Sequence, residues 1–297
     1  MTTAQPLPAN VRELYPWSGH YFAQPDGNKQ HYLDEGSGKP VLMVHGNPTW
    51  SFYWRSLVKA LSDEYRCIVP DHIGSGLSDK PSEWSYRLED HIANLVRLIE
   101  HLDLRDLTVI VHDWGGPIGL GAAGRVADRV SRLVVCNTAV QFLGAAPLSI
   151  RMCQTPLGDV LIRGFNAFIK VGLIRATSDR KRMKGPIATG YMAPYPDWAS
   201  RIGQLRFVQD IPFRNGHPTK VTMEGVYEGL DAFEQHPKLL IWGERDFVFT
   251  PAYRQAWMQR FPDTEEHALA DASHWVVEDA ADRVTHLVTD FLSRTQT

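Results

Sequence analysis

The chain has 297 residues, of which 43% are hydrophobic and 22% are charged, as in an ordinary globular protein. Its net charge of −3 gives no electrostatic basis for binding nucleic acid, and no apolar stretch is long enough to span a membrane. The three cysteines form no CxxC pair and the N-terminus lacks the features of a signal peptide, so we expect a cytoplasmic protein.

Short runs rich in Val and Ile alternate with helix-like segments along most of the chain. Residues 21–36, which contain the turn signal Asp26-Gly27, predict an antiparallel hairpin. Further strands are predicted at 41–45, 66–71, 107–113, 132–137, 238–242 and 265–270. Helices are predicted at 54–61, 87–101, 251–261 and 279–292. This alternation predicts an α/β fold with a mostly parallel eight-stranded sheet and helices on both faces.

The most informative stretch is LTVIVHDWGGPIGLG, residues 107–121. An apolar strand ends in His112-Asp113-Trp114, and the glycines that follow permit a sharp turn and close packing of the next helix. This pattern is typical of the nucleophile elbow of α/β-hydrolases, with Asp113 in place of the usual Ser. The alternative interpretation of Asp113 is a residue that caps a helix N-terminus.

The alternation stops after Asn137 and resumes at Lys238. The segment between them has helix-like stretches at 158–168 and 197–208 but no clear strand. Because the interruption follows the strand after the elbow helix, we expect a helical cap at this point of the fold.

The expected boundaries divide the chain into three parts. Residues 1–140 form the first part of the α/β-hydrolase main domain, 141–231 the cap, and 232–297 the second part of the main domain. The basic run at 180–184 is interpreted as a solvated helix face, with anion binding as the alternative.

Loops after three predicted strands carry groups suited to nucleophilic catalysis. The HGNP sequence after the first buried strand suits an oxyanion hole, made by the backbone N–H groups of Asn47 and Trp114. Asp246 and His274 follow the last two strands, which gives the order nucleophile, acid, His that α/β-hydrolases share. Glu244 is a competing acid, but Asp246 lies further out along the loop.

The sequence predicts neither a metal nor an organic cofactor. It contains no HExxH motif or Cys/His cluster, and no GxGxxG opens a helix after a strand. The expected partner is a small apolar substrate, and the oligomeric state is left open, including a homo-oligomer. Candidates for the pocket lining are the aromatic residues Phe142, Phe168, Trp198 and Phe207. Packing within the cap's own core is the alternative role for these side chains.

Taken together, the motifs resemble the haloalkane dehalogenase family of α/β-hydrolases over nearly the whole chain. The matching segments are HGNPTWSFYWR (45–55), DHIGSGLSDKP (71–81), HDWGG (112–116), YMAPYP (191–196), WGERDFVF (242–249) and SHWVVED (273–279). The residues Asn137-Thr138-Ala139 include no carboxylate, so the chain resembles the subgroup with a late catalytic Asp.

This resemblance implies a role for each of five residues. Asp113 is the nucleophile, His274 the base, and Asp246 the group that orients His274. The side-chain N–H groups of Asn47 and Trp114 bind the departing halide. An ionised Asp needs no base to attack carbon, so it forms an alkyl-aspartate ester directly. Water activated by the imidazole then releases the alcohol, so that alcohol and halide are the products.

Other resemblances leave alternative functions open. DHIGSGLSDKP, RLVVCNTA, FNAF and RFVQDIP also resemble the β-lactone decarboxylases of bacterial olefin biosynthesis, which share the catalytic residues. Epoxide hydrolases share HDWGG and use two cap tyrosines, which Tyr191 and Tyr195 could imitate, but they usually have an aromatic residue where Asn47 stands. A non-catalytic binding protein is the remaining alternative. The chain argues against it, because every expected catalytic position is filled.

Overall fold

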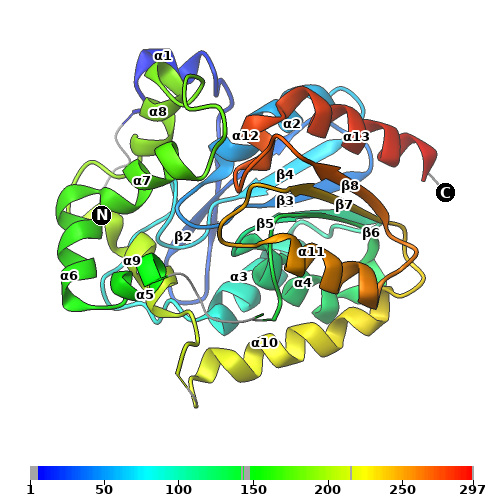
Figure 1. The fold of residues 1–297 in the computed structure, drawn as a ribbon. Helices are drawn as coiled ribbons and strands as arrows, with labels where there is room; N and C mark the ends of the chain where they lie inside the picture. Colours follow the sequence, from blue (N-terminus) through cyan, green and yellow to red (C-terminus); the bar gives the residue numbers. More distant parts are fainter. Residues whose placement is uncertain (1–5, 142, 144–147, 215, 296–297) are drawn as a thin grey trace.

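The computed structural model describes residues 6–141, 143, 148–214 and 216–295, and one eight-stranded sheet lies at its centre (Figure 1). The strand order is β1-β2-β4-β3-β5-β6-β7-β8. The strands are β1 (His20–Ala23), β2 (Lys29–Glu35), β3 (Pro40–Val44), β4 (Arg66–Pro70), β5 (Leu107–His112), β6 (Val130–Cys136), β7 (Lys238–Gly243) and β8 (Glu265–Leu269). Strand β2 pairs antiparallel with β1 and β4, whereas all other neighbours are parallel. The predicted hairpin and mostly parallel sheet are confirmed.

Each face of the sheet is covered by its own set of helices, because successive strand residues point to opposite sides. Val41 and Met43 of β3 face one core, and Leu42 and Val44 face the other. The first core packs against α2 (Arg55–Leu61), α12 (Val276–Asp279) and α13 (Ala281–Arg294). The second packs against α3 (Leu88–His101), α4 (Gly115–Arg125) and α11 (Pro251–Arg260). The predicted α/β fold with helices on both faces is therefore confirmed.

Between β6 and β7 the described residues form helices and no strand. These are α5 (Leu148–Cys153), α6 (Pro156–Asp159), η3 (Val160–Gly164), α7 (Ala167–Arg175), α8 (Gly185–Met192), η4 (Ala199–Arg201), α9 (Ile202–Gln209), α10 (Pro218–Gly229) and η5 (Leu230–Phe233). Helices α5 to α9 gather beside the sheet, while α10 runs along α3 and α4 (Figure 1). The helix expected at 158–168 is wrong as one element, because Asn166 has a φ of 52° and interrupts it before α7 begins.

None of the helices in the described part of the chain combines the length and apolar character needed to cross a membrane.

A buried ion pair links the main sheet's helices to helix α8. Arg55 at the start of α2 donates to both carboxylate oxygens of Glu278 in α12, at 2.5 and 2.9 Å. The hydroxyl of Tyr191 in α8 donates to the same carboxylate at 2.5 Å. Burial alone would raise the pKa of Glu278, but Arg55 outweighs it and lowers this pKa. The ionised pair and the Tyr191 hydroxyl therefore connect α2, α12 and α8.

Glu278→Gln should lower the free energy of unfolding by about 3–5 kcal/mol, because it leaves the buried Arg55 without a countercharge. Chemical denaturation at neutral pH measures this loss. The matched control is Asp290→Asn, which removes a carboxylate half exposed on α13 and paired with Arg294. That change should cost less than about 1 kcal/mol. Equal losses in the two variants would contradict the assigned role of Glu278.

Candidate active site

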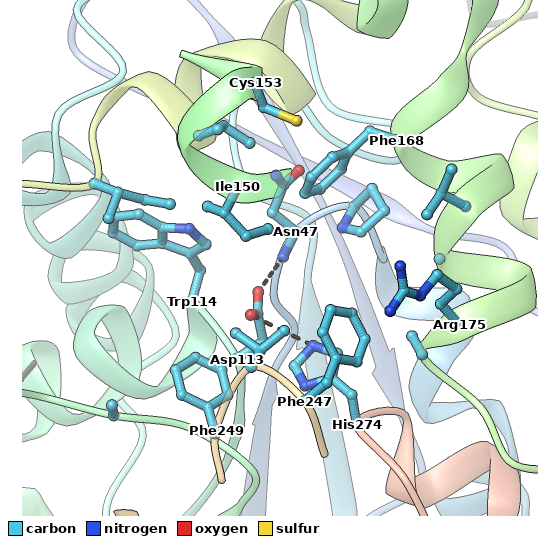
Figure 2. A pocket seen from close by; sticks show the side chains of 18 of the residues that line it. Asn47, Asp113, Trp114, Ile150, Cys153, Phe168, Arg175, Phe247, Phe249 and His274 are labelled. Atoms are coloured by element: carbon cyan, nitrogen blue, oxygen red, sulfur yellow. Dashed lines mark hydrogen bonds and ion pairs between the residues drawn. The ribbon is translucent and has the colours of Figure 1, made fainter. Parts of the chain in front are cut away.

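The loops after β3, β5, β7 and β8 bring four of the predicted residues to one edge of the sheet. Asn47 follows β3, Asp113 follows β5, Asp246 follows β7 and His274 follows β8. The carboxyl ends of parallel strands meet at one edge, which is where open α/β sheets bind ligands. Figure 2 shows Asp113 between the Asn47 backbone and the His274 ring.

Asp113 lies on a sharp turn, and this turn requires small residues around it. Its φ is 52°, an uncommon value for a residue with a side chain. A Cβ atom on Gly115 would lie 2.1 Å from the Val44 carbonyl oxygen, and one on Gly46 would lie 2.2 Å from the Asp113 carboxylate. Glycine at both positions therefore allows the carboxylate to stand at the end of the strand.

Two backbone N–H groups hold the Asp113 carboxylate. The Asn47 N–H donates to Oδ1 at 2.6 Å, and the Trp114 N–H donates to the same carboxylate. These are the two donors expected to form the oxyanion hole. Burial raises the pKa of Asp113, and His274 with the two N–H groups opposes that rise only in part. Ionised Asp113 is thus poorly solvated, which favours its reaction with an electrophile.

His274 stands between two carboxylates. Its Nδ1 is 2.8 Å from Asp246 Oδ2, and its Nε2 is 3.6 Å from Asp113 Oδ2. Burial alone would lower the pKa of His274, but Asp246 and then Asp113 outweigh it and raise this pKa. The imidazole can therefore carry a proton toward Asp113 while Asp246 fixes its orientation.

Asp246, rather than Glu244, faces the imidazole. The backbone N–H groups of Val248 and Phe249 donate to Asp246 Oδ1 at 2.7 and 3.0 Å. Glu244 is turned away and pairs with Arg254 at 2.8 Å. The loop that follows β7 thus folds around the carboxylate further from the strand.

Asn137 carries no carboxylate, but its side chain holds Asp246 in place. Its Nδ2 donates to Asp246 Oδ2 at 3.0 Å and to the Gly243 carbonyl at 3.1 Å. Its Oδ1 accepts from the Gly243 N–H at 2.8 Å. The signal available in the sequence was its place at the end of β6, beside the strand that delivers Asp246.

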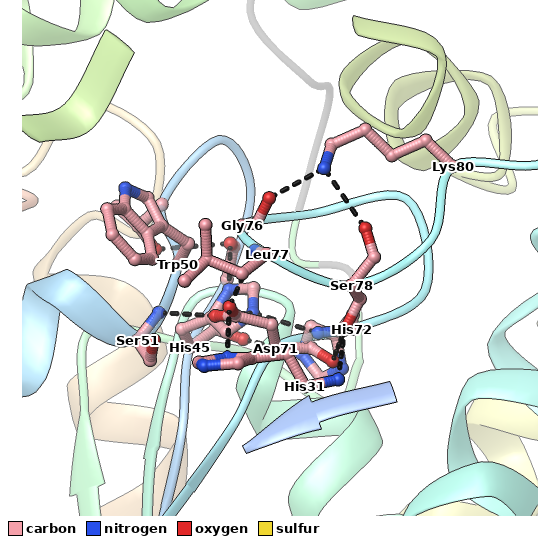
Figure 3. A network of polar contacts seen from close by, with 12 residues as sticks. His31, His45, Trp50, Ser51, Asp71, His72, Gly76, Leu77, Ser78 and Lys80 are labelled. Atoms are coloured by element: carbon pink, nitrogen blue, oxygen red, sulfur yellow. Dashed lines mark hydrogen bonds and ion pairs between the residues drawn. The ribbon is translucent and has the colours of Figure 1, made fainter. Parts of the chain in front are cut away.

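A buried polar network supports the Asn47 loop from behind (Figure 3). His45 Nε2 accepts the His72 backbone N–H at 3.1 Å, so its proton is on Nδ1, which donates to the Gly46 carbonyl at 2.7 Å. Burial lowers the pKa of His45, consistent with this neutral tautomer. Asp71 accepts from His31 Nδ1 at 2.8 Å and from the Ser51 N–H at 2.7 Å. These hydrogen bonds therefore fix the turn that directs the Asn47 N–H toward Asp113.

A largely apolar cavity of about 390 Å³ lies above Asp113 and His274. Among the described residues that line it, the charged side chains are Asp113, His274 and Arg175. Helices α5, α7 and η3 and the loop at 247–250 supply half of the remaining lining residues. A substrate in this cavity would be held by apolar contact, with its reactive atoms over the carboxylate.

The four predicted pocket residues fall in different places. Phe168 lines the cavity, and Phe142 lies outside the described residues. Phe207 does not line the cavity, because it packs behind Trp114 with a ring distance of 5.6 Å. Trp198 does not line it either, because it is 44% exposed and stacks under Arg163 on the surface. Aromatic composition predicted an apolar site but not which faces of the helices between β6 and β7 form it.

The side chains of Asn47 and Trp114 both line the cavity, but they are not equally available. Asn47 Nδ2 donates to the Gln204 carbonyl at 3.1 Å, which leaves at most one of its N–H groups for a ligand. Trp114 Nε1 has no hydrogen-bond partner among the described residues. Trp114 is therefore the better placed donor for a leaving anion.

Comparison with known proteins gives matches along nearly the whole chain. The model of the alpha/beta hydrolase fold family matches residues 39–156. A Shewanella oneidensis protein named cis-3-alkyl-4-alkyloxetan-2-one decarboxylase is 43% identical, covering 96% of this chain and 91% of its own length. A protein of the same name from Xanthomonas campestris is 39% identical, over 90% of this chain and 93% of its own.

Haloalkane dehalogenases also match. Haloalkane dehalogenase 2 of Mycobacterium tuberculosis is 34% identical, over 92% of this chain and 94% of its own. The crystal structure of the haloalkane dehalogenase DatA from Agrobacterium tumefaciens superposes with a TM-score of 0.83 at 26% identity. It covers 94% of this chain and 97% of that one.

Proposed function

Because the chain belongs to the haloalkane dehalogenase-like family of α/β-hydrolases, we propose that it decarboxylates cis-3,4-dialkyl-β-lactones to alkenes through a covalent ester on Asp113. The observation that carries the choice of reaction is the 43% identity to a protein named for it, against 34% for a haloalkane dehalogenase. The sequence motifs placed dehalogenation ahead of lactone decarboxylation, and these identities reverse that order.

The cavity supports a substrate with substantial alkyl groups. Its volume of about 390 Å³ falls within the range of pockets that enclose drug-sized ligands. Alkyl chains would gain apolar contact along α5 and α7, while the strained ring would lie near Asp113. Burial of those chains supplies binding energy that can position the ring for attack.

In the first step, an Asp113 oxygen attacks the saturated, alkyl-bearing ring carbon bonded to the ring oxygen, not the carbonyl carbon. The new C–O bond forms as the ring C–O bond breaks, and the electron pair leaves on a carboxylate still attached to the neighbouring carbon. The side-chain N–H of Trp114, assisted by Asn47, stabilises this growing negative charge. The backbone N–H groups of Asn47 and Trp114 aim the attacking carboxylate.

In the second step, the bond between that neighbouring carbon and its carboxylate breaks, releasing carbon dioxide. The freed electron pair forms the C=C bond, and the ester C–O bond breaks to return the Asp113 carboxylate. Protonated His274, whose Nε2 is 3.6 Å from Asp113, stabilises the departing oxygen. Attack with inversion followed by anti elimination converts a cis lactone into a cis alkene, and no water is consumed.

The test is a paired product assay on the purified protein. A long-chain cis-β-lactone should give cis alkene, seen by gas chromatography, with a kcat/KM at least about tenfold above that for halide release from 1-bromoalkanes. Fast halide release with only traces of alkene would overturn the proposal in favour of dehalogenation.

Hydrolytic dehalogenation is the second candidate, favoured by the two side-chain donors beside Asp113. In that reaction the leaving group is a halide, which requires both donors at once, and His274 must act as a base for water. Asn47 Nδ2 already donates to the Gln204 carbonyl, so at most one of its N–H groups remains for the halide.

Trp114→Phe should slow lactone decarboxylation roughly 10²–10³-fold, because it keeps the ring but deletes one donor to the leaving carboxylate. Steady-state kinetics measures this loss. Trp257→Phe is the matched control, since Trp257 lies on α11 away from the cavity and donates to Thr264. Equal rates for the two variants would rule out a role for the Trp114 N–H.

A further inference from the structure

Exposed apolar side chains gather in one part of the helical insertion. Among the described residues, twelve large apolar side chains are exposed, and eight of them lie between residues 143 and 174. They are Leu143, Leu148, Met152, Leu157, Val160, Phe165, Val171 and Ile174. Scattered exposed apolar residues need no explanation, but a concentration of this kind marks an interaction surface.

The exposed faces of α5 and α7 combine these apolar side chains with positive charge. On α7, the exposed residues Lys170, Val171, Ile174 and Arg175 follow helical spacing, so they share one face. On α5, Leu148, Arg151 and Met152 do the same. We call these seven residues the α5–α7 surface; it contains no carboxylate.

The cavity above Asp113 opens at this surface. Met152, Val171 and Arg175 are all exposed, and all three also line the cavity. Figure 2 shows Arg175 at the side of the cavity, away from Asp113. A ligand that moves past these three side chains would pass from the apolar surface into the apolar cavity.

The charge of this region is opposite to that of the whole chain. Residues 143–184 contain eight Lys and Arg residues and two carboxylates, whereas the full chain has 31 Lys and Arg against 34 Asp and Glu. Arg175 has no ion-pair partner among the described residues. Its guanidinium lies over the Phe247 ring. The α5–α7 surface is thus both apolar and basic in a protein that is acidic overall.

We propose that the α5–α7 surface docks onto an anionic lipid bilayer, so that the mouth of the cavity opens to the membrane. Helices with apolar side chains flanked by Lys and Arg lie in the interface, with the apolar groups among the acyl chains and the charges at the headgroups. Long Lys and Arg side chains reach the headgroups while their stems lie on apolar surface. Molecules with long alkyl chains partition into the same layer, whichever leaving group the enzyme acts on.

The test is co-sedimentation of the full chain with lipid vesicles. Wild-type protein should bind phosphatidylcholine vesicles that contain phosphatidylglycerol, and bind phosphatidylcholine alone more than tenfold more weakly. Salt at 1 M, where the screening length is about 3 Å, should weaken the first interaction to near the second. The double variant Arg151→Glu/Lys170→Glu should lower the partition coefficient for anionic vesicles more than about tenfold.

Two further variants separate the surface from general effects. Leu148→Glu/Ile174→Glu should also abolish vesicle binding, while both double variants retain wild-type activity on a short-chain substrate in solution, since none of the four residues lines the cavity. The matched control is Lys220→Glu/Val221→Glu, an exposed basic and apolar pair on α10, which should leave binding unchanged.

Three results would overturn this proposal. The first is equal binding to neutral and anionic vesicles, and the second is equal loss of binding in the α10 control. The third is no vesicle binding together with self-association that Leu148→Glu/Ile174→Glu disrupts, which would make this surface an interface between copies of the chain.

Discussion

Asp113→Ala should reduce turnover of any substrate by more than about 10⁴-fold, because the substrate then has no carboxylate to bond with. The variant should nevertheless fold. Burial raises the pKa of Asp113, so its ionised form opposes folding at neutral pH, and alanine should leave the free energy of unfolding unchanged or higher. Kinetics and denaturation on the same preparation measure both effects.

Turnover by Asp113→Ala within tenfold of wild type would contradict the assignment of the nucleophile. Asp113→Asn is a weaker probe, because slow deamidation can restore the carboxylate. Asp103 is exposed and does not line the cavity, so Asp103→Ala is a control for loss of a carboxylate.

His274→Phe should trap the covalent intermediate. Asp113 needs no base for its attack, but the ester departs slowly once the imidazolium that faces it is gone. With a β-lactone, intact-mass measurement should show a gain equal to the whole lactone, because the carboxylate is still attached. With a bromoalkane, the gain should be the alkyl group alone after release of about one equivalent of bromide.

The control for this variant is His286→Phe, which replaces an exposed His on α13. It should turn over normally and carry no adduct. Continuous alkene formation by His274→Phe at the wild-type rate, without an adduct, would contradict both the covalent step and the role of the imidazole.

The sheet was predictable because its strands carry a simple signal. Short runs rich in Val and Ile, separated by turn residues, gave the strands and their alternation with helices. The chain order of Asp113, Asp246 and His274 placed each after a strand, and parallel strands bring their carboxyl ends together.

The helical insertion was less predictable because its geometry depends on how helices lie against each other. Asn166 interrupts a stretch that reads as one helix, and neither Trp198 nor Phe207 lines the cavity. The pairing of Asn137 with Asp246 joins neighbouring strand ends that are distant in sequence. Periodicity describes single elements, so contacts of this kind become visible only in the folded chain.

Multiple turnover of a long-chain cis-β-lactone in ¹⁸O-labelled water tests the central claim most directly. If the ring-opened ester collapses to alkene and carbon dioxide, the Asp113 carboxylate returns without exchange. The peptide that contains Asp113 should then stay unlabelled while cis alkene accumulates over many turnovers. Incorporation of ¹⁸O into that peptide, with β-hydroxy acid as the product, would show hydrolysis of the ester and contradict the proposed decarboxylation.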